Sequence, residues 1–263
     1  MKFKEFDAKM RIYEEAHDHC VLPGVHMVAR LDGRGFTRLT KETLVLEKPF
    51  DRLFQHAMAA TTRHVMDCGF RTTYAYVQSD EISMLLARDD VTYDRKLRKL
   101  LSVLASEASA AFTKYLVLEM GVANPEFVVG TFDCRICQLP HEQDVVDYFR
   151  WRQADAKRNA RNAHVYWALR DRGETPRMAD KMMALMDWET KTTFLLENGI
   201  NPDNFPDWVT HGTGFRWEKY TKQGTDPRTG EKKLAQRRRI VQLDLPEGDI
   251  YGDFIGDLLD DVG

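Results

Sequence analysis

Two acidic segments hold the side chains of this 263-residue chain that are best suited to chemistry. In "VARLDGRGF" (28–36) an apolar run leads directly into Asp32, and a Gly-Arg-Gly turn follows it. In "YAYVQSDEISMLL" (74–86) two apolar runs flank Ser79, Asp80 and Glu81. Two carboxylates held a few ångström apart repel each other unless a cation lies between them. If folding brings the two segments together, they predict either raised carboxylate pKa values or a bound divalent cation.

Mg²⁺ is the cation that such a site favours, because it binds through one or two carboxylates, water and substrate phosphate. The glycine turn adds a backbone carbonyl and N–H groups that phosphate can approach closely. The pattern indicates nucleotidyl transfer with two metal ions, one activating the attacking hydroxyl and one stabilising the leaving group. Each aspartate alone is more typical of a turn or a helix cap. Only their joint placement favours the metal site.

Hydrophobic spacing predicts the elements that must position these acids. Helices are expected at 3–18, 49–68 and 92–117, and strands at 25–31, 72–78, 82–87 and 126–139. After the first helix the order is strand, helix, strand, strand, helix, strand, which is the βαββαβ unit of a ferredoxin-like α+β sheet. Its first and third strands are antiparallel neighbours. The end of the first strand, with Asp32, is therefore expected beside the turn that holds Asp80.

The remainder of the chain is expected to be mostly helical. Helices are predicted over 144–173 and 175–199, followed by a β-hairpin around "DPRTG" (226–230). The last twenty residues or so are acidic and contain spaced glycines, which predicts a poorly ordered or edge-packed tail.

Basic residues are grouped locally, although the net charge of the chain is -3. Any contact with nucleic acid must therefore come from basic patches. The segment "RWRQADAKRNAR" (150–161) has the composition of an RNA-backbone site with an aromatic residue for stacking. Its candidate RNA-binding residues are Arg150, Arg152, Lys157, Arg158 and Arg161. The same segment also fits an amphipathic helix packed through Trp151, Ala154 and Val165, and both can hold for one helix. "QRRR" (236–239), with Lys232 and Lys233, is a second basic surface, typical by itself of a solvated hairpin.

Three lysines are candidates for binding a triphosphate. Lys96 and Lys99 lie three residues apart near the start of a predicted helix, where they can donate charge-assisted hydrogen bonds. Lys48, which precedes Pro49, is the third candidate. Arg95 is expected on a solvated helix face.

The cysteines allow two interpretations. Cys134 and Cys137 have the spacing of a zinc site that His141 could extend, with further ligands from "HDHC" (17–20): His17, His19 or Cys20. We favour a strand with reduced thiols, because alternation places Cys134 and Ile136 on one side and Cys137 on the other. No segment approaches the roughly eighteen apolar residues of a membrane span or contains the apolar core of a signal peptide. We therefore expect a soluble, cytoplasmic protein.

Four motifs together resemble the tRNA-His guanylyltransferase family. They are "RLDGRGF", "KPFD", "AYVQSDEISMLL" and "WRQAD…YWAL", and the match runs from about residue 5 to about 220. The resemblance is strongest to the tRNA-His guanylyltransferase-like branch of 3′-5′ polymerases. It implies a palm-like catalytic domain over 1–140 and a helical and hairpin RNA-binding region, 141–263, packed on it. It also implies activation of a tRNA 5′ end by ATP or GTP, attack by the 3′-hydroxyl of an incoming nucleoside triphosphate, and a homotetramer.

The resemblance also assigns roles to residues. Catalysis falls to Asp32, Asp80 and Glu81, and two Mg²⁺ ions to Asp32, the Gly33 carbonyl and Asp80. Nucleotide binding falls to Asp32, Gly33, Arg34, Gly35, Phe36, Thr37, Lys48, Ser79, Asp80, Lys96 and Lys99. One departure matters: the eukaryotic enzymes carry His-Ile-Asn-Asn-Leu-Tyr-Asn where this chain has residues 157–163, and only Asn159 is retained. This favours templated repair of 5′-truncated tRNA over obligate addition of G to tRNA-His.

Three alternatives remain open. The first is tRNA-His-specific addition of one G. The second is a nucleotidyl cyclase or dinucleotide synthase, which uses a similar palm and two metal ions without RNA. The third is an RNA-binding module that keeps the palm only as a scaffold and binds tRNA regardless of Mg²⁺ and nucleotide. The clustered acids argue against the third, because binding RNA alone does not require them.

Overall fold

A single six-stranded antiparallel sheet forms the centre of the protein. The computed structural model describes residues 2–119, 129–225, 228 and 231–260. The strands are β1 (His26–Arg34), β2 (Thr72–Gln78), β3 (Glu81–Leu86), β4 (Thr131–Leu139), β5 (Thr213–Thr225) and β6 (Lys232–Asp244). Their order in the sheet is β4-β1-β3-β2-β5-β6. The first and third strands are therefore antiparallel neighbours, as the βαββαβ pattern predicts.

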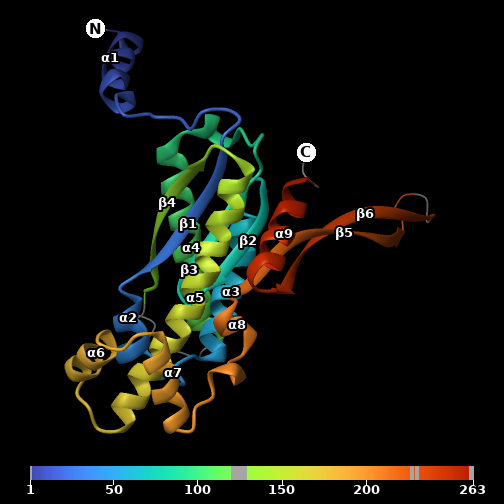
Figure 1. Cartoon of the computed structure of the whole chain (residues 1–263). Coiled ribbons are helices and arrows are strands. Elements are labelled where there is room, and N and C mark those ends of the chain that lie inside the picture. The colour runs from blue at the N-terminus through green and yellow to red at the C-terminus, as the bar shows by residue number, and fades with distance from the viewer. Residues whose placement is uncertain (1, 120–128, 226–227, 229–230, 261–263) are drawn as a thin grey trace.

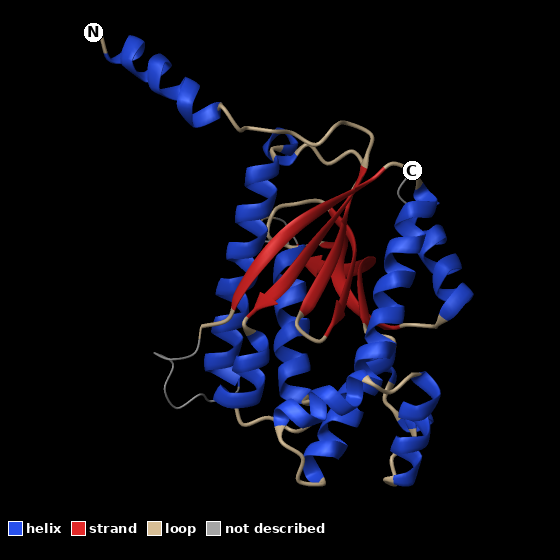
Figure 2. Cartoon of the chain, turned by 60° about the vertical axis from the view of Figure 1, so that its left-hand side comes forward, coloured by secondary structure: helices blue, strands red, loops and turns tan. Residues whose placement is uncertain are grey.

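Helices cover both faces of the sheet (Figure 2). On one face α3 (Arg52–Met66) and α4 (Leu97–Glu119) pack on side chains such as Leu31 and Ile82. On the other face α5 (Glu142–Asp171) and α9 (Gly248–Asp260) pack on Val28 and Leu85. Alternate residues of the central strands are thus buried on opposite sides. This explains why these strands are almost continuously apolar, as strands buried on both faces are.

The other helices lie at the two ends of the sheet (Figure 1). They are α1 (Phe3–Glu15), α2 (Phe36–Arg38), η1 (Leu39–Thr43), η2 (Thr92–Arg95), α6 (Pro176–Ala184), α7 (Trp188–Glu197), η4 (Pro202–Asn204) and α8 (Asp207–Thr210). The helices α6 and α7 pack on the C-terminal part of α5 around Val165 and Leu195. The helix α1 stands apart from the sheet and buries none of its residues.

Two predicted helices begin later than expected. The helix α3 starts at Arg52 because Asp51 caps it, accepting a hydrogen bond from the Phe54 N–H at 2.9 Å. The helix α4 starts at Leu97, after a 3₁₀ turn. The prediction of a solvated Arg95 is wrong, because this residue is only 5% exposed and its guanidinium donates to backbone carbonyls. The acceptors are Val21, Val25, Arg88 and Asp90.

The helix α4 has one further property. Among the residues that the structure describes, Leu97–Leu118 is long and apolar enough, by length and composition alone, to cross a membrane. Buried core helices pass the same test, and Leu100, Leu104 and Phe112 of α4 are buried in the core on the sheet. The cytoplasmic location stays a prediction.

The C-terminal segment is not a loosely held tail. Residues 248–260 form α9, in which Tyr251 and Ile255 are fully buried against α5 and the sheet. The prediction was wrong because the aspartates of this segment lie on the outer side of an amphipathic helix. Residues 261–263 lie outside the described part of the chain.

The predicted hairpin is present, and it belongs to the central sheet. Residues 74–77 of β2 pair with residues 213–216 of β5, so the sheet continues across the expected boundary at residue 140. Most of the predicted turn, 226–230, lies outside the described residues. The division into two parts therefore stays a prediction.

Cys134 and Cys137 lie in β4, as the strand interpretation predicts. Cys134 and Ile136 pack in the layer of α3 and α4, whereas Cys137 packs in the layer of α5 and α9. Within the described ranges, no group of three or more His, Cys, Asp or Glu side chains could hold a metal ion. The zinc alternative is therefore not supported. The N-terminal part of the expected strand, 126–128, lies outside the described residues.

Candidate active site

The sheet brings the two acidic segments together at one end of its central strands β1 and β3. We call this end, which carries Asp32 and Asp80, the acid edge. Asp32 near the end of β1 lies opposite Glu81 at the start of β3. The next residue, Gly33, donates its N–H to the carbonyl oxygen of Asp80 at 3.0 Å. Because Gln78 pairs with Glu81, Ser79 and Asp80 alone make the turn between β2 and β3. The predicted neighbourhood of Asp32 and Asp80 is therefore confirmed.

The electrostatics of this edge suit a cation. Burial raises the pKa of Asp80, and the negative charge of Asp32 adds to this effect. A divalent cation between the two carboxylates would offset both the loss of hydration and the mutual repulsion of the charges. In an antiparallel strand the N–H and C=O of one residue point to the same neighbour. The Gly33 carbonyl oxygen therefore lies on the side of Asp80, and the donor set of two carboxylates and one carbonyl fits Mg²⁺.

Ser79 holds this turn in a strained conformation. Its φ is 47°, in the left-handed region, and its hydroxyl lies 3.1 Å from a carboxylate oxygen of Asp80. Two-residue hairpin turns require positive φ and favour glycine or asparagine. A serine here indicates that the hydroxyl has a use that outweighs the backbone strain.

Ser79→Gly is expected to raise the free energy of unfolding by about 1 kcal/mol, because glycine adopts positive φ without strain. Urea unfolding measures this change. The control is Ser79→Ala, which removes the hydroxyl and keeps the strain, so it should not stabilise the protein. Equal effects of both substitutions would show that backbone strain at Ser79 is not the cause.

Gly33 is required by the packing of Phe36. A Cβ atom at Gly33 would lie only 2.5 Å from the Cγ atom of Phe36. Phe36 is 2% exposed and packs against the rings of Phe54, Phe112 and Phe132. The side chain of Phe36 is therefore part of the core, so its predicted contact with the nucleotide, which stays a prediction, would have to come from its backbone. The expected neighbours Arg34, the last residue of β1, and Gly35 and Thr37, which follow it, are exposed.

Gly33→Ala is expected to lower the free energy of unfolding by about 1–3 kcal/mol, because it forces the Phe36 ring out of its place. Denaturant unfolding measures this loss. Adding Phe36→Leu should recover part of it, since the smaller side chain makes room for the methyl group. No recovery in the double variant would contradict this explanation.

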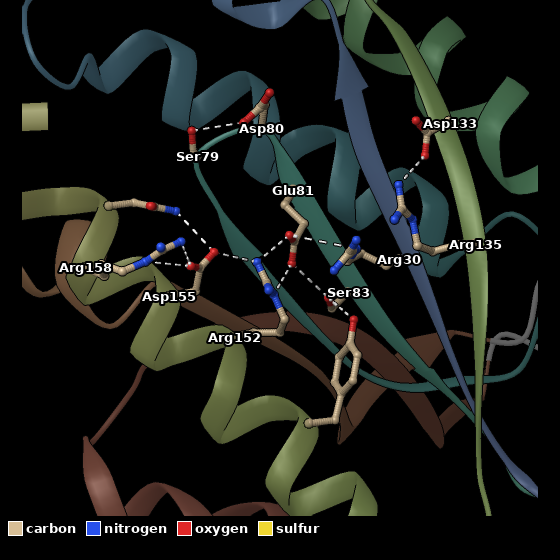
Figure 3. Close-up of polar contacts among 12 residues, drawn as sticks. Arg30, Ser79, Asp80, Glu81, Ser83, Asp133, Arg135, Arg152, Asp155 and Arg158 are labelled. Carbon is tan, nitrogen blue, oxygen red and sulfur yellow. Dashed lines mark hydrogen bonds and ion pairs between the residues drawn. The ribbon is translucent and has the colours of Figure 1, made fainter. Parts of the chain in front are cut away.

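Glu81 and Arg152 form a buried ion pair beside the acids (Figure 3). The carboxylate of Glu81 accepts from Nε of Arg152 at 2.8 Å and from Nη2 at 2.7 Å. Arg30 approaches the same carboxylate at 4.0 Å, and Ser83 donates to it at 3.3 Å. Figure 3 shows Glu81 pointing toward Arg152, whereas Asp80 points away from the pair.

This pair constrains the predicted roles of both residues. Glu81 and Arg152 are 7% and 5% exposed, so neither side chain is free on the surface. Arg152 also binds Asp155 at 2.8 Å, which leaves it no position from which to contact an RNA backbone. Glu81 links β3 to α5 through this ion pair, and its catalytic role stays a prediction.

A pocket of about 340 Å³ opens next to Ser79. Lys48 lines it, as predicted for a nucleotide-binding residue, and its Nζ donates to the Thr40 carbonyl. The same Nζ lies 5.3 Å from the centre of the Trp167 ring, and Lys41 lies 4.2 Å from the Tyr166 ring. Burial lowers the pKa of Lys48. The loop after α2 is thus held on α5 by two cation–π contacts, with a lysine at the pocket.

The sequence did not reveal most of the pocket wall. Further lining residues are Phe50, Gln78, Asn159, Asn162, Tyr166, Trp167 and Trp208. One pattern in the sequence could have indicated the pocket. Three small residues share one face of α5 and leave room for a ligand: Ala156, Ala160 and Ala163.

Lys96 and Lys99 do not lie at the acid edge. Residues 19–20, which precede β1, contact the start of α4: the Leu97 N–H donates to the His19 carbonyl at 2.8 Å. From His26 at the start of β1 to Asp32, six residue steps span roughly 20 Å. Lys96 instead forms an ion pair with Asp18 at 2.7 Å. The prediction that these lysines complete the same site within one chain is wrong, because α4 starts where β3 ends, at the opposite end of the sheet.

The four other predicted RNA-binding residues of α5 all have partners in the chain. Arg150 pairs with Asp249 at 2.6 Å, and Lys157 pairs with Glu247 at 2.7 Å. Arg158 pairs with Asp155. Arg161 donates to Thr192 and lies 3.6 Å from the centre of the Trp188 ring. RNA would have to replace these contacts.

Comparison with known proteins agrees with the motifs at this site. The family model described as tRNAHis guanylyltransferase matches residues 7–140, and the Thg1 C-terminal domain matches residues 143–248. The mouse protein named probable tRNA(His) guanylyltransferase is 30% identical over 249 residues, covering 91% of this chain and 82% of the mouse protein.

Solved structures give the same result. A bacterial tRNA(His) guanylyltransferase-like protein in complex with ATP has a TM-score of 0.68 and 26% identity, covering 90% of this chain and 91% of that one. Its complex with GTP has a TM-score of 0.60 and 25% identity, covering 89% and 90%. The chain therefore belongs to the tRNA(His) guanylyltransferase family of nucleotidyltransferases.

Proposed function

We propose that this enzyme adds nucleotides in the 3′-to-5′ direction to tRNA 5′ ends, and that its reaction is templated repair of 5′-truncated tRNA. The observation that carries the proposal is the meeting of Asp32 and Asp80 at a sheet edge next to a pocket with Ser79 and Lys48. Its volume of about 340 Å³ lies in the range of small-ligand pockets. The ATP and GTP complexes of the bacterial relative support nucleoside triphosphates as substrates.

Two Mg²⁺ ions, held by Asp32, Asp80 and the Gly33 carbonyl oxygen, would neutralise phosphate charge and make the attacking hydroxyl more acidic. The protein itself contributes position and charge. Lys48 meets the triphosphate as a charge-assisted donor, and Ser79 donates its hydroxyl beside Asp80. The Glu81–Arg152 pair holds the acid edge against α5. Positioning and preorganised charge are the main sources of rate in phosphoryl transfer.

The reaction has two steps. ATP or GTP first transfers a nucleotidyl group to a tRNA 5′-monophosphate and releases pyrophosphate. The 3′-hydroxyl of the incoming nucleoside triphosphate then attacks the activated 5′-phosphate, and the activating nucleotide leaves as its monophosphate. Templating is supported by residues 157–163, which retain only Asn159 of the segment found in the eukaryotic enzymes.

Extension of 5′-truncated tRNAs tests this proposal. The base opposite the missing 5′ nucleotide is varied through all four identities, and the incorporated nucleotide is identified. Incorporation that follows the opposing base supports templated repair. Incorporation of G whatever the base would contradict it.

A second candidate, addition of one G to tRNA-His, is favoured by the names of relatives such as the mouse probable tRNA(His) guanylyltransferase. Full-length tRNA-His lacking that nucleotide separates the two functions, because only the second candidate requires this tRNA.

A parallel incubation with ATP and GTP but no RNA examines the cyclase alternative. A cyclic or dinucleotide product there would favour that alternative over both.

The proposal includes a homotetramer. The exposed apolar face of α1, with Phe3, Phe6 and Met10, supports self-association because such a face is otherwise costly in water. Light scattering coupled to gel filtration measures the mass. A monomeric mass at micromolar concentration would contradict the tetramer and leave the proposed reaction untouched.

A further inference from the structure

We propose that Gln78 is a specificity-determining residue, whose side-chain amide recognises the adenine base of the activating nucleotide at its N6 and N7 positions. This inference rests on the proposed function, because it takes the pocket beside Ser79 as the place where that nucleotide binds. Gln78 is the last residue of β2 and directly precedes the turn of Ser79 and Asp80. The group that recognises the base is therefore adjacent in the chain to groups proposed to hold the phosphates.

The side-chain amide of Gln78 is buried without a hydrogen-bond partner. The residue is only 6% exposed, and among the residues that the structure describes none forms a hydrogen bond with this side chain. A buried amide normally has partners, because losing its hydration without gaining a hydrogen bond costs free energy. Gln78 lines the pocket, so a ligand bound there can supply the missing partners.

A second buried glutamine shows how a structural amide is bonded in this protein. Gln153 of α5 is also 6% exposed. Its Nε2 atom donates to the carbonyl oxygens of Pro246 at 2.8 Å and of His211 at 3.4 Å. Gln153 therefore holds α5 against the segments that precede α9 and β5. The two glutamines are equally buried, and only Gln153 has the partners that a structural role provides.

Strand alternation places Gln78 on the side of the sheet that faces α5. Tyr76 of β2 packs in the layer of α5 and α9, whereas Val77 packs in the layer of α3 and α4. Gln78 points to the same side as Tyr76, since successive side chains of a strand alternate. The part of α5 that lines the pocket carries Ala156 and Ala160. These small side chains leave space for a ligand beside the amide.

The pocket has the chemistry of a site for a planar, polar ring. Four aromatic side chains line it: Phe50, Tyr166, Trp167 and Trp208. The indole N–H of Trp208 is a second buried donor without a partner in the described part of the chain. Aromatic walls with a few polar groups are typical of sites that enclose one small ligand and fix its orientation. A nucleobase, with two aromatic faces and a hydrogen-bonding edge, meets both requirements.

The amide of a glutamine matches adenine better than guanine. Adenine presents an N–H donor at N6 beside an acceptor at N7, so the amide oxygen and the amide nitrogen each form one hydrogen bond. Guanine presents acceptors at both O6 and N7, which leaves the amide oxygen facing another acceptor. Gln78 therefore favours ATP over GTP in the activation step.

The test measures Mg²⁺-dependent binding of three triphosphates by isothermal titration calorimetry without RNA. They are ATP, GTP and purine riboside triphosphate, which is ATP without its 6-amino group. The unmodified protein should bind ATP about tenfold or more tightly than either of the others, the size of effect expected of one bidentate pair. In Gln78→Leu the affinity for ATP should fall by the same factor, and the affinity for purine riboside triphosphate should not fall. A preference for ATP that persists unchanged in Gln78→Leu overturns the proposal.

Urea unfolding distinguishes recognition of a ligand from a structural role of Gln78. Gln78→Leu should unfold at the same or a higher urea concentration, because it replaces an unpartnered amide by an apolar side chain of similar size. The control Gln153→Leu should unfold at a lower concentration, because it removes two hydrogen bonds, and it should keep the preference for ATP over purine riboside triphosphate. Equal losses of stability in both variants, with the preference kept in both, would assign Gln78 a structural role and overturn the proposal.

The calorimetry also separates this inference from the proposed function. Equal affinity of the unmodified protein for all three triphosphates overturns base recognition by Gln78 and leaves the proposed reaction intact. If none of the three triphosphates binds, both the inference and the proposed function are wrong.

Discussion

Replacing Asp32 or Asp80 by asparagine is expected to slow nucleotide transfer by at least about 100-fold, the size of effect seen when one preorganised charge-stabilising group is removed. Asparagine keeps the shape of the side chain and removes the charge that holds the cations. The fold should remain intact. For Asp80, whose side chain is partly buried, the substitution removes a charge whose neighbour is also negative, so stability should not fall. Single-turnover extension of a 5′-truncated tRNA measures the rate, and urea unfolding measures the stability.

The control for this prediction is Asp89→Asn. Asp89 is an exposed carboxylate paired with Arg71 at the other end of the sheet, so its loss removes one negative charge away from the acid edge. Transfer should proceed at its normal rate in this variant. Near-normal transfer by either Asp32→Asn or Asp80→Asn would show that the catalytic site lies elsewhere.

Arg152→Ala is expected to lower the free energy of unfolding by about 3–5 kcal/mol, because it leaves Glu81 buried without its main partner. Denaturant unfolding of the single variants and of Arg152→Ala/Glu81→Ala gives the coupling between the two residues. The double variant should lose less stability than the two single variants together, since no buried charge is left unpaired. The KM for the nucleotide should also rise in Arg152→Ala, because α5 carries one wall of the pocket.

Arg150 provides a matched control on the same helix. Its ion pair with Asp249 is exposed, and exposed pairs contribute about 0–1 kcal/mol. Arg150→Ala should therefore have little effect on unfolding. If Arg152→Ala and Arg150→Ala were equally mild, the buried pair would not be the structural link between β3 and α5 that we infer.

The core of the site can be predicted from the sequence because topology alone determines it. Once the βαββαβ order is read from hydrophobic spacing, the end of β1 must lie beside the β2–β3 turn, and Asp32 and Asp80 follow. The same topology places the start of α4 at the far end of β3. It therefore excludes Lys96 and Lys99 from the acid edge, although their spacing and charge suit a triphosphate.

Other features depend on tertiary packing, which spacing does not reveal. The Glu81–Arg152 pair exists because α5 lies across the sheet, and no sequence pattern gives that placement. A glutamate in a turn and an arginine in a basic segment look solvated until their neighbours are known. In α9 the acidic composition suggested a solvated tail, although the segment is a packed helix. Its four aspartates lie on one side, and the other side carries the apolar residues Tyr251, Phe254, Ile255 and Leu258. The helical period of these apolar residues is the signal that predicts the helix.

The central claim is that Asp32 and Asp80 share divalent cations beside the nucleotide pocket. Crystals soaked with Mn²⁺ and a non-hydrolysable ATP analogue test it most directly, since anomalous scattering locates the ions. We predict two peaks, each roughly 2.0–2.3 Å from carboxylate oxygens of these aspartates, with the triphosphate near Lys48. Peaks elsewhere, or a bound nucleotide with no ion at either aspartate, would contradict the account.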